Sequence, residues 1–208
     1  MNQLPADAIS FNGEDFGRSG DLTVHVPLIQ TQNLVRRVPF VVELRNVPFR
    51  QQEQIAFYLI DRLPRFTGGA FDARGNGQFL AEVAMQRYGA SRIQQVMLSE
   101  GWYRDNMPPF KAAFEDGGIV LPKDREILGD IRALKMVRGV IRLVERNTGD
   151  NAGQRHGDAA MAGALAYAAS RAEPEEYGYQ AARRPPDRSR PSRDEDRPRR
   201  QRELRGAL

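Results

Sequence analysis

Short runs of apolar and β-branched residues, separated by turn residues, occupy the first part of the chain, a pattern that is typical of β-strands. Residues 8–16 and 22–29 are predicted to form two strands joined by Gly17-Arg18-Ser19-Gly20-Asp21, and residues 35–44 a third. Pro39 lies within the third run and, because proline cannot donate a ladder hydrogen bond, it favours an edge position or a bulge. Three strands in succession predict an antiparallel meander.

Helical spacing of the apolar residues begins near residue 50. Ile55, Leu59 and Leu63 recur at intervals of four and predict a helix over residues 50–63. Helices and single strands then alternate as far as residue 170. These later elements are a short strand ending at Asp72, a helix that turns Phe79, Leu80, Val83, Ala84 and Tyr88 inward, a strand at 92–98, a helix at 107–115, an extended piece at 118–121, a helix at 124–137, a hairpin arm at 140–144 and an alanine-rich helix at 158–170.

This order of elements predicts an α/β fold with a mixed sheet flanked by helices. The three leading strands would be antiparallel, and the later strands would add in parallel through right-handed crossovers. That arrangement is the ribonuclease-H one.

The composition changes near Glu173. Residues 173–208 are rich in Arg and Pro and have almost nothing to bury, so we expect a folded domain over 1–172 and a disordered tail over 173–208. Residues 1–182 carry a net charge of −1 and residues 183–208 a net charge of +5. The basic character therefore belongs to the tail, which is either a solvated terminus or an arginine arm that touches nucleic acid phosphates.

Several classes of protein are excluded by composition. The chain has no cysteine and two histidines, which argues against disulfides and against the usual zinc sites. No apolar run reaches the roughly 18 residues of a membrane helix, and the first residues lack the features of a secretory signal. We therefore expect a cytoplasmic protein with no membrane partner.

Three aspartates stand next to glycine-containing turns at the predicted ends of elements: Asp15, Asp72 and Asp158, separated by 57 and 86 residues. Carboxylates from separate elements can converge in a fold, and hard oxygen ligands hold Mg²⁺ or Mn²⁺. Two such ions about 4 Å apart can clamp the attacking water and the leaving oxygen in phosphodiester hydrolysis. The three acids therefore predict a metal-dependent nuclease site.

Each aspartate also has a structural explanation. Asp158 could cap the last helix, Asp72 could form an Asx-turn, and Asp15 could be a turn residue. Glu14 stands where a strand residue is usually apolar, which weakens the prediction that the first strand is buried.

Three motifs around these acids resemble the nuclease half of large terminase subunits from Mu-like phages. The motifs are Glu14-Asp15-Phe16-Gly17-Arg18-Ser19-Gly20-Asp21-Leu22-Thr23, Phe71-Asp72-Ala73-Arg74-Gly75-Asn76-Gly77 and Arg155-His156-Gly157-Asp158-Ala159-Ala160. Residues 110–122 are similar too, and the resemblance spans roughly residues 8–171.

The resemblance implies a ribonuclease-H-like endonuclease that cuts concatemeric DNA during capsid filling. It implies Asp15, Asp72 and Asp158 as the catalytic and metal-binding triad for two Mg²⁺ or Mn²⁺ ions, with Asp21 as a secondary acid. It also implies a supporting role for His156, which would orient a ligand or a phosphate; the alternative is a polar turn residue.

The partners follow from the same resemblance. Double-stranded DNA is the expected substrate, and Arg18, Arg74 and Arg155 lie in or near the motif loops, where they could contact its phosphates. The expected protein partners are the terminase ATPase domain, the small terminase subunit and the portal. No G-x-x-x-x-G-K-[ST] motif occurs in these 208 residues, so we expect no ATP hydrolysis by this chain.

Two other functions remain open at this stage. One is an actin- or sugar-kinase-like nucleotide-binding lobe, because Asp15-Phe16-Gly17-Arg18-Ser19 resembles the first phosphate loop of those proteins. The other is a non-catalytic interaction module of the packaging machine. Divalent-ion-dependent nicking of plasmid DNA would separate the nuclease from both.

Overall fold

The computed structural model describes residues 4–17, 22–30, 32–143 and 157–172. The chain divides into two compact units, Met1–Glu175 and Glu176–Leu208, and every described residue lies in the first. The predicted tail, residues 173–208, lies outside the described residues.

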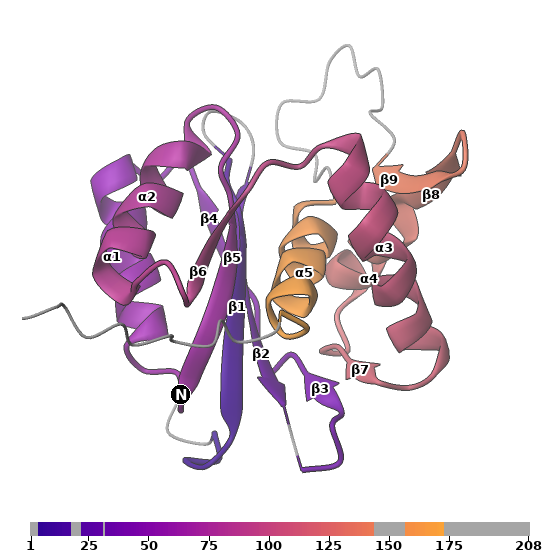
Figure 1. Cartoon of the computed structure of the whole chain (residues 1–208), viewed down its shortest axis with the longest axis horizontal. Coiled ribbons are helices and arrows are strands. Elements are labelled where there is room, and N and C mark those ends of the chain that lie inside the picture. The colour runs from indigo at the N-terminus through magenta and orange to yellow at the C-terminus, as the bar shows by residue number, and fades with distance from the viewer. Residues whose placement is uncertain (1–3, 18–21, 31, 144–156, 173–208) are drawn as a thin grey trace, which may run out of the picture. The chain divides into compact units, whose positions relative to one another are not determined.

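A mixed sheet forms the centre of this first unit (Figure 1). Its strands lie in the order β6-β5-β1-β2-β3-β7, and β4 also pairs with β2. β2 is antiparallel to β1, β3 and β4, whereas β1, β5 and β6 are parallel to one another. The strands are β1 (Ile9–Asp15), β2 (Leu22–Gln30), β3 (Arg36–Arg37), β4 (Val42–Arg45), β5 (Phe66–Asp72), β6 (Ile93–Val96) and β7 (Ile119–Val120).

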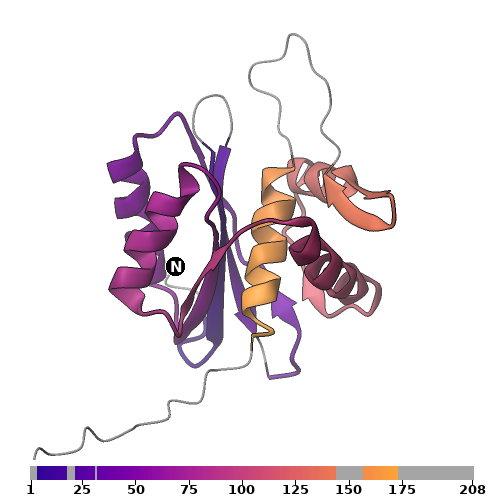
Figure 2. The same cartoon turned by 45° about the horizontal axis from the view of Figure 1, so that its top comes forward.

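Helices cover both faces of the sheet (Figures 1 and 2). α1 (Phe49–Ile60) and α2 (Gly77–Tyr88) lie on one face, and α5 (Asp158–Ala169) lies on the other, against β1, β2 and β5. α3 (Glu100–Glu115) and α4 (Arg125–Ala133) pack outside α5. A separate hairpin, β8 (Leu134–Val137) with β9 (Val140–Leu143), follows α4.

α5 is buried on all sides because it lies between the sheet and the outer helices. All twelve of its residues are buried, and most are alanine, so the helix can approach its neighbours closely. The closest approach is at Gly13 of β1, where an added Cβ would lie 1.9 Å from the carbonyl oxygen of Ala162 and 2.3 Å from the nitrogen of Ala166. The sequence of β1 therefore determines how near α5 comes to the sheet.

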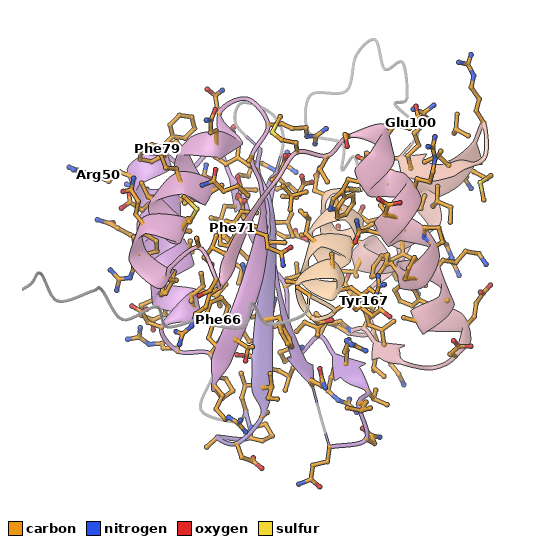
Figure 3. All side chains as sticks on the ribbon, viewed as in Figure 1. Arg50, Phe66, Phe71, Phe79, Glu100 and Tyr167 are labelled. Carbon is orange, nitrogen blue, oxygen red and sulfur yellow. The ribbon has the colours of Figure 1, made fainter. Side chains whose placement is uncertain are left out.

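Each face of the sheet has its own apolar core (Figure 3). Phe71 packs with residues of α1 and α2 on one side. On the other side, the ring of Tyr167 in α5 packs at a tilt against that of Phe110 in α3, with ring centroids 5.7 Å apart. The sheet is thus enclosed on both faces, as is usual where parallel strands are present.

These observations confirm the predicted mixed sheet, an antiparallel meander extended by parallel strands and flanked by helices. The third predicted strand is divided into β3 and β4, with Pro39 in the break, in agreement with the effect expected of proline. No helix among the described residues combines the length and the apolar character that crossing a membrane requires.

Three details of the predicted elements are wrong. The helix predicted at 107–115 begins at Glu100, because the Ser99 hydroxyl caps it by accepting the Trp102 N–H. The helix predicted at 124–137 ends at Ala133, and the residues after it pair as β8. Phe79, predicted to point inward, is 46% exposed and stacks on Phe49 instead.

Candidate active site

Two of the predicted acids end neighbouring strands. In the parallel pairing of β1 with β5, Glu14 is opposite Phe71, so Asp15 and Asp72 follow as the last residues of the two strands. Both are buried, with 8% and 3% of their surfaces exposed. The fold therefore brings Asp15 and Asp72 together.

Both acids face α5. Side chains alternate along a strand, so Asp15 shares the face of Gly13, which contacts α5. Asp72 shares the face of Ala70, which belongs to the α5-side core, whereas Phe71 belongs to the opposite core. Asp15 and Asp72 therefore open toward the helix that carries the third predicted acid.

Asp158 is the first residue of α5 and is also buried. Both views show α5 beginning at the end of the sheet where β1 and β5 end (Figures 1 and 2). The structural explanation for Asp158, that it caps the helix, is wrong. The cap is Gly157, which adopts the left-handed conformation with φ 89°. Asp130 of α4 anchors this end, because its Oδ2 accepts the Ala159 N–H at 3.2 Å.

Asp72 is engaged by Arg74. Its Oδ1 accepts the Arg74 backbone N–H at 3.0 Å, which is the Asx-turn given above as its structural explanation. The Arg74 guanidinium also donates to both oxygens: Nε lies 3.0 Å from Oδ1 and 3.2 Å from Oδ2, and Nη2 lies 2.9 Å from Oδ2. A cation is thus already held against both oxygens of this carboxylate.

Glu14 lies behind the two aspartates, on the face covered by α1 and α2. It is fully buried, and among the described residues neither of its carboxyl oxygens has a hydrogen-bond partner. Burial raises the pKa of Glu14 well above its usual value, and the charges of Asp15 and Asp72 raise it further. Glu14 therefore lies within reach of the charges of Asp15 and Asp72.

His25 lies directly across from Glu14 in the pairing of β1 with β2. Its ring meets Phe71 edge-on, with centroids 6.4 Å apart, and its Nδ1 lies 3.4 Å from Nδ2 of Asn12. Burial lowers the pKa of His25 to about 4, so the ring is neutral at physiological pH. The side chain opposite Glu14 is therefore neutral and adds no positive charge on the face covered by α1 and α2.

The chain just after Asp15 is held by hydrogen bonds from β2 and α1. The Thr23 hydroxyl accepts the Gly17 N–H at 3.0 Å and lies 2.8 Å from both the Gly17 carbonyl and Oε1 of the buried Gln52. Gly77, at the start of α2, also approaches this region: an added Cβ would lie 2.3 Å from the Asp72 carbonyl oxygen and 3.1 Å from Cβ of Phe16. These contacts fix the backbone on both sides of the acid pair.

Tyr103 of α3 lies beside the acids. Burial raises its pKa, Asp15 and Asp72 raise it further, and Arg74 and Arg142 lower it. Arg142 belongs to β9, so the hairpin contributes a positive charge that acts on Tyr103 of α3.

The three aspartates do not form a closed cage. Within the described ranges, no group of three or more His, Cys, Asp or Glu side chains could hold one metal ion. The donor set nevertheless fits a hard divalent cation in its chemistry, because carboxylates are the ligands such ions prefer and the Arg74 guanidinium already acts as a stand-in cation at Asp72. Arg18, Asp21, Arg155 and His156 lie outside the described residues.

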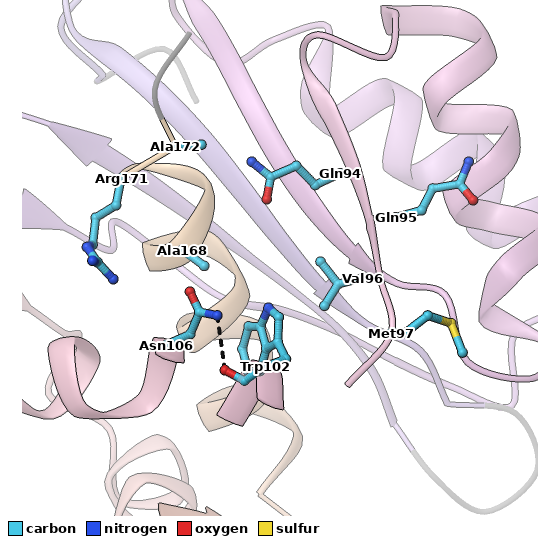
Figure 4. Close-up of a pocket in the computed structure, with 9 residues that line it drawn as sticks. All are labelled: Gln94, Gln95, Val96, Met97, Trp102, Asn106, Ala168, Arg171 and Ala172. Atoms are coloured by element: carbon cyan, nitrogen blue, oxygen red, sulfur yellow. Dashed lines mark hydrogen bonds between the residues drawn. The ribbon is translucent and has the colours of Figure 1, made fainter. Parts of the chain in front are cut away.

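A pocket of about 420 Å³ lies between the edge strand β6 and α3 (Figure 4). Gln94 and Val96 line one side, and Trp102, Asn106 and Arg171 line the other. Asn106 donates its Nδ2–H to the Trp102 carbonyl at 3.0 Å, as the dashed line in Figure 4 shows. Arg171 follows the carboxyl end of α5, whereas Val96 pairs with Asp72 in the sheet, so the pocket runs along β6 as far as the strand end that neighbours the acids.

Two proteins from Mu-type elements match three-quarters of the chain. The "Probable terminase, large subunit gp28" of Escherichia phage Mu is 46% identical over 160 residues, which are 76% of this chain and 29% of that protein. The "Mu-like prophage FluMu protein gp28" of Haemophilus influenzae is 42% identical over 158 residues, which are 76% of this chain and 31% of that protein. This chain is homologous to part of the large terminase subunit of Mu-like phages. It spans less than a third of each of these relatives.

Solved structures with a similar fold are also parts of large terminases. The large terminase nuclease of thermophilic phage G20c superposes with a TM-score of 0.63 at 20% identity, covering 79% of this chain and 84% of that one. The large terminase nuclease domain of Thermus phage P74-26 gives 0.59 at 19% identity, covering 79% and 80%. The G20c nuclease has also been solved with bound magnesium, cobalt and zinc. No protein-family model matches the chain.

The chain therefore has the ribonuclease-H-like fold of terminase nuclease domains, as its motifs predicted. Membership of the terminase family, which the two relatives show, argues against the actin- or sugar-kinase-like lobe. Sequence reasoning missed Asp130 as the anchor of α5, Tyr103 as a neighbour of the acids, and Gln52 as a support for the chain after Asp15. The first lies within a helical pattern that carries no motif, and the other two acquire their roles only through packing.

Proposed function

We propose that this chain is the metal-dependent endonuclease domain of a phage DNA-packaging terminase, and that it hydrolyses DNA phosphodiesters with two Mg²⁺ or Mn²⁺ ions. The proposal rests mainly on one observation. Asp15 and Asp72 end adjacent parallel strands on the face toward α5, which begins with Asp158, in a chain homologous to large terminase subunits. The metals bound to the G20c nuclease support the choice of cofactor.

In this proposal Asp15, Asp72 and Asp158 hold the ions, with Asp21 as a secondary acid. Bound divalent ions supply Lewis-acid stabilisation of the developing charge on phosphate and lower the pKa of the attacking water. The three carboxylates come from β1, β5 and α5. The hydrogen bond of Thr23 fixes the chain after β1, and that of Asp130 fixes the start of α5. Arg18, Arg74 and Arg155 contact backbone phosphates, and His156 supports a ligand or a phosphate.

The partners proposed for the chain are double-stranded DNA, the terminase ATPase domain, the small subunit and the portal, in the cytoplasm of an infected host. Residues 1–172 form the nuclease domain, and residues 173–208 form an arginine-rich arm that raises the local concentration of duplex. Truncation after Ala172 should weaken DNA binding and flatten its salt dependence, while turnover at saturating DNA stays similar. An unchanged salt slope would contradict the role proposed for the arm.

The test of the nuclease is nicking of supercoiled plasmid by the full chain with Mg²⁺ or Mn²⁺. We expect cleavage that EDTA abolishes and that Asp72→Asn removes. Asp61→Asn is the matched control, because Asp61 also accepts a hydrogen bond from an arginine, Arg87 at 2.7 Å, but lies at the end of α1 and is not among the proposed ligands. Cleavage in excess chelator, or full activity of Asp72→Asn, would contradict the proposal. No cleavage under any condition would favour the interaction module.

A further inference from the structure

Arg74 holds Asp72 in the manner of a counterion. Three donors of one residue, its backbone N–H, Nε and Nη2, converge on the two oxygens of a carboxylate that is only 3% exposed. Paired donation from a planar guanidinium to a carboxylate is among the strong forms of hydrogen bond in proteins. The contact is thus a specific fork and not a chance approach of surface charges.

Electrostatics explains why a cation is needed there. Asp15 and Asp72 end adjacent parallel strands and face the same side of the sheet, so their charges lie close together. Like charges that share a buried site repel each other, and a nearby positive charge relieves that repulsion. Arg74 supplies this charge from a side chain that is itself 48% exposed, so it stabilises the pair without being enclosed by it.

We propose that Arg74 is a built-in counterion that a divalent metal must displace from Asp72, so that this residue sets the metal affinity of the site. The inference rests on the proposed function, because it takes Asp72 as a metal ligand. The guanidinium and a metal ion need the same carboxylate oxygens, and two cations cannot share them without repulsion.

The local backbone allows this exchange. Arg74 lies on the turn between β5 and α2, next to Gly75, which has φ 52° and no atom within 4 Å of an added Cβ. The half-exposed guanidinium can therefore move toward solvent while Asp72 stays at the end of its strand. Only after that movement are its Nε and Nη2 available for a DNA phosphate, so the phosphate contact proposed for Arg74 depends on metal binding.

The experiment is a calorimetric titration of the full chain with Mn²⁺ alone, without DNA. Arg74→Gln removes the competing charge and should bind Mn²⁺ about tenfold more tightly than the wild type. Arg74→Lys keeps the charge but loses the fork, and we expect an intermediate affinity. Arg87→Gln is the matched control: it makes the same charge change and breaks the 2.7 Å pair with Asp61, and its Mn²⁺ affinity should equal that of the wild type.

Each outcome separates the inference from the proposed function. Equal Mn²⁺ affinity of the wild type and Arg74→Gln, with binding lost in Asp72→Asn, would overturn the counterion and leave the metal site intact. A similar gain in Arg87→Gln would also overturn it, because the effect would then be one of net charge. If neither the wild type nor Arg74→Gln binds Mn²⁺, the proposed metal site fails, and the inference fails with it. Thermal melts of the variants establish that each is folded.

Discussion

Glu14 and Asp15 are consecutive acids at the end of β1, yet they lie in different surroundings. Asp15 faces α5 beside Asp72 and retains 8% exposure, whereas Glu14 faces α1 and α2 with none. Its carboxyl oxygens have no hydrogen-bond partner in the described part of the chain, and burial raises its pKa. Because successive side chains on a strand point to opposite faces, one peptide unit separates an acid suited to cation binding from one that strains the core.

The largest effect is expected on nicking activity, when the charge of Asp15 is removed. Asp15→Asn keeps the size of the side chain but removes a charge from the proposed ligand set, so nicking activity should fall on the order of a thousandfold or more. Melting temperature in EDTA should change little, because the removed charge lies beside that of Asp72. Plasmid nicking and a thermal melt on the same preparation test both points. Retained activity would show that Asp15 is only a turn residue.

A large loss of stability is expected at Gly13, which shares the face of Asp15. An added methyl group would overlap backbone atoms of Ala162 and Ala166, so Gly13→Ala should destabilise the domain by about 3 kcal/mol. Gly129→Ala is the control, because no atom lies within 4 Å of a Cβ added in α4, and alanine favours the helix. Denaturant unfolding of the two variants should therefore shift in opposite directions. Equal stability of Gly13→Ala and the wild type would contradict the close packing of α5.

His25, which pairs with Glu14 across β1 and β2, reports on burial of this face of the sheet through the pH dependence of stability. The folded pKa of His25 is about 4 against an ordinary value of 6.5, so the unfolded chain binds more protons between these values. His25 therefore lowers stability as pH falls from 6.5 toward 4, by about 2 kcal/mol at pH 5.

Free energies of unfolding at pH 7.5 and pH 5 measure this effect. His25→Gln should lose less stability than the wild type over that interval, whatever its absolute stability. Identical losses in the two proteins would indicate that the ring is protonated in the folded state.

Glu14 itself should give a smaller effect of the opposite sign. Its folded pKa is raised above 4.5, so its unfavourable burial is absent below that pH and grows as pH rises through the folded pKa. Glu14→Gln should therefore raise the melting temperature at pH 7 in EDTA by about 3 °C, and the gain should disappear near pH 4. Glu82→Gln, at an exposed position of α2, keeps an oxygen that can accept from Gln86 and should leave the melting temperature unchanged at both pH values. A lower melting temperature for Glu14→Gln would mean that the carboxyl group has a stabilising partner.

The elements of this fold could be predicted well from periodicity, because strands and helices differ in the spacing of buried residues. The acids that end β1 and β5 could be predicted for a related reason: each closes a predicted strand and precedes a glycine-containing turn. The break at Pro39 between β3 and β4 could be predicted too, because proline has no N–H to donate to a neighbouring strand.

Other features depend on contacts that no local pattern records. The start of α3 is determined by the Ser99 cap, and the stop of α4 at Ala133 depends on the pairing of β8 with β9. The burial of Glu14 contradicts its polarity and results from alternation on a strand enclosed on both faces. The fork between Arg74 and Asp72 needs a side-chain conformation, which spacing in the sequence does not specify.

The contact of Gly13 with α5 has a consequence for the order of folding. β1 leaves the ribosome first and α5 last among the described elements, so the surface around Asp15 stays open until almost the whole domain has been synthesised. Contacts between such distant segments form slowly because a long loop must close. The nascent chain thus carries two of its acids on finished strands while the third is still absent. In the proposed function, cutting activity arises only when the final helix docks, which protects DNA from incomplete copies of the enzyme.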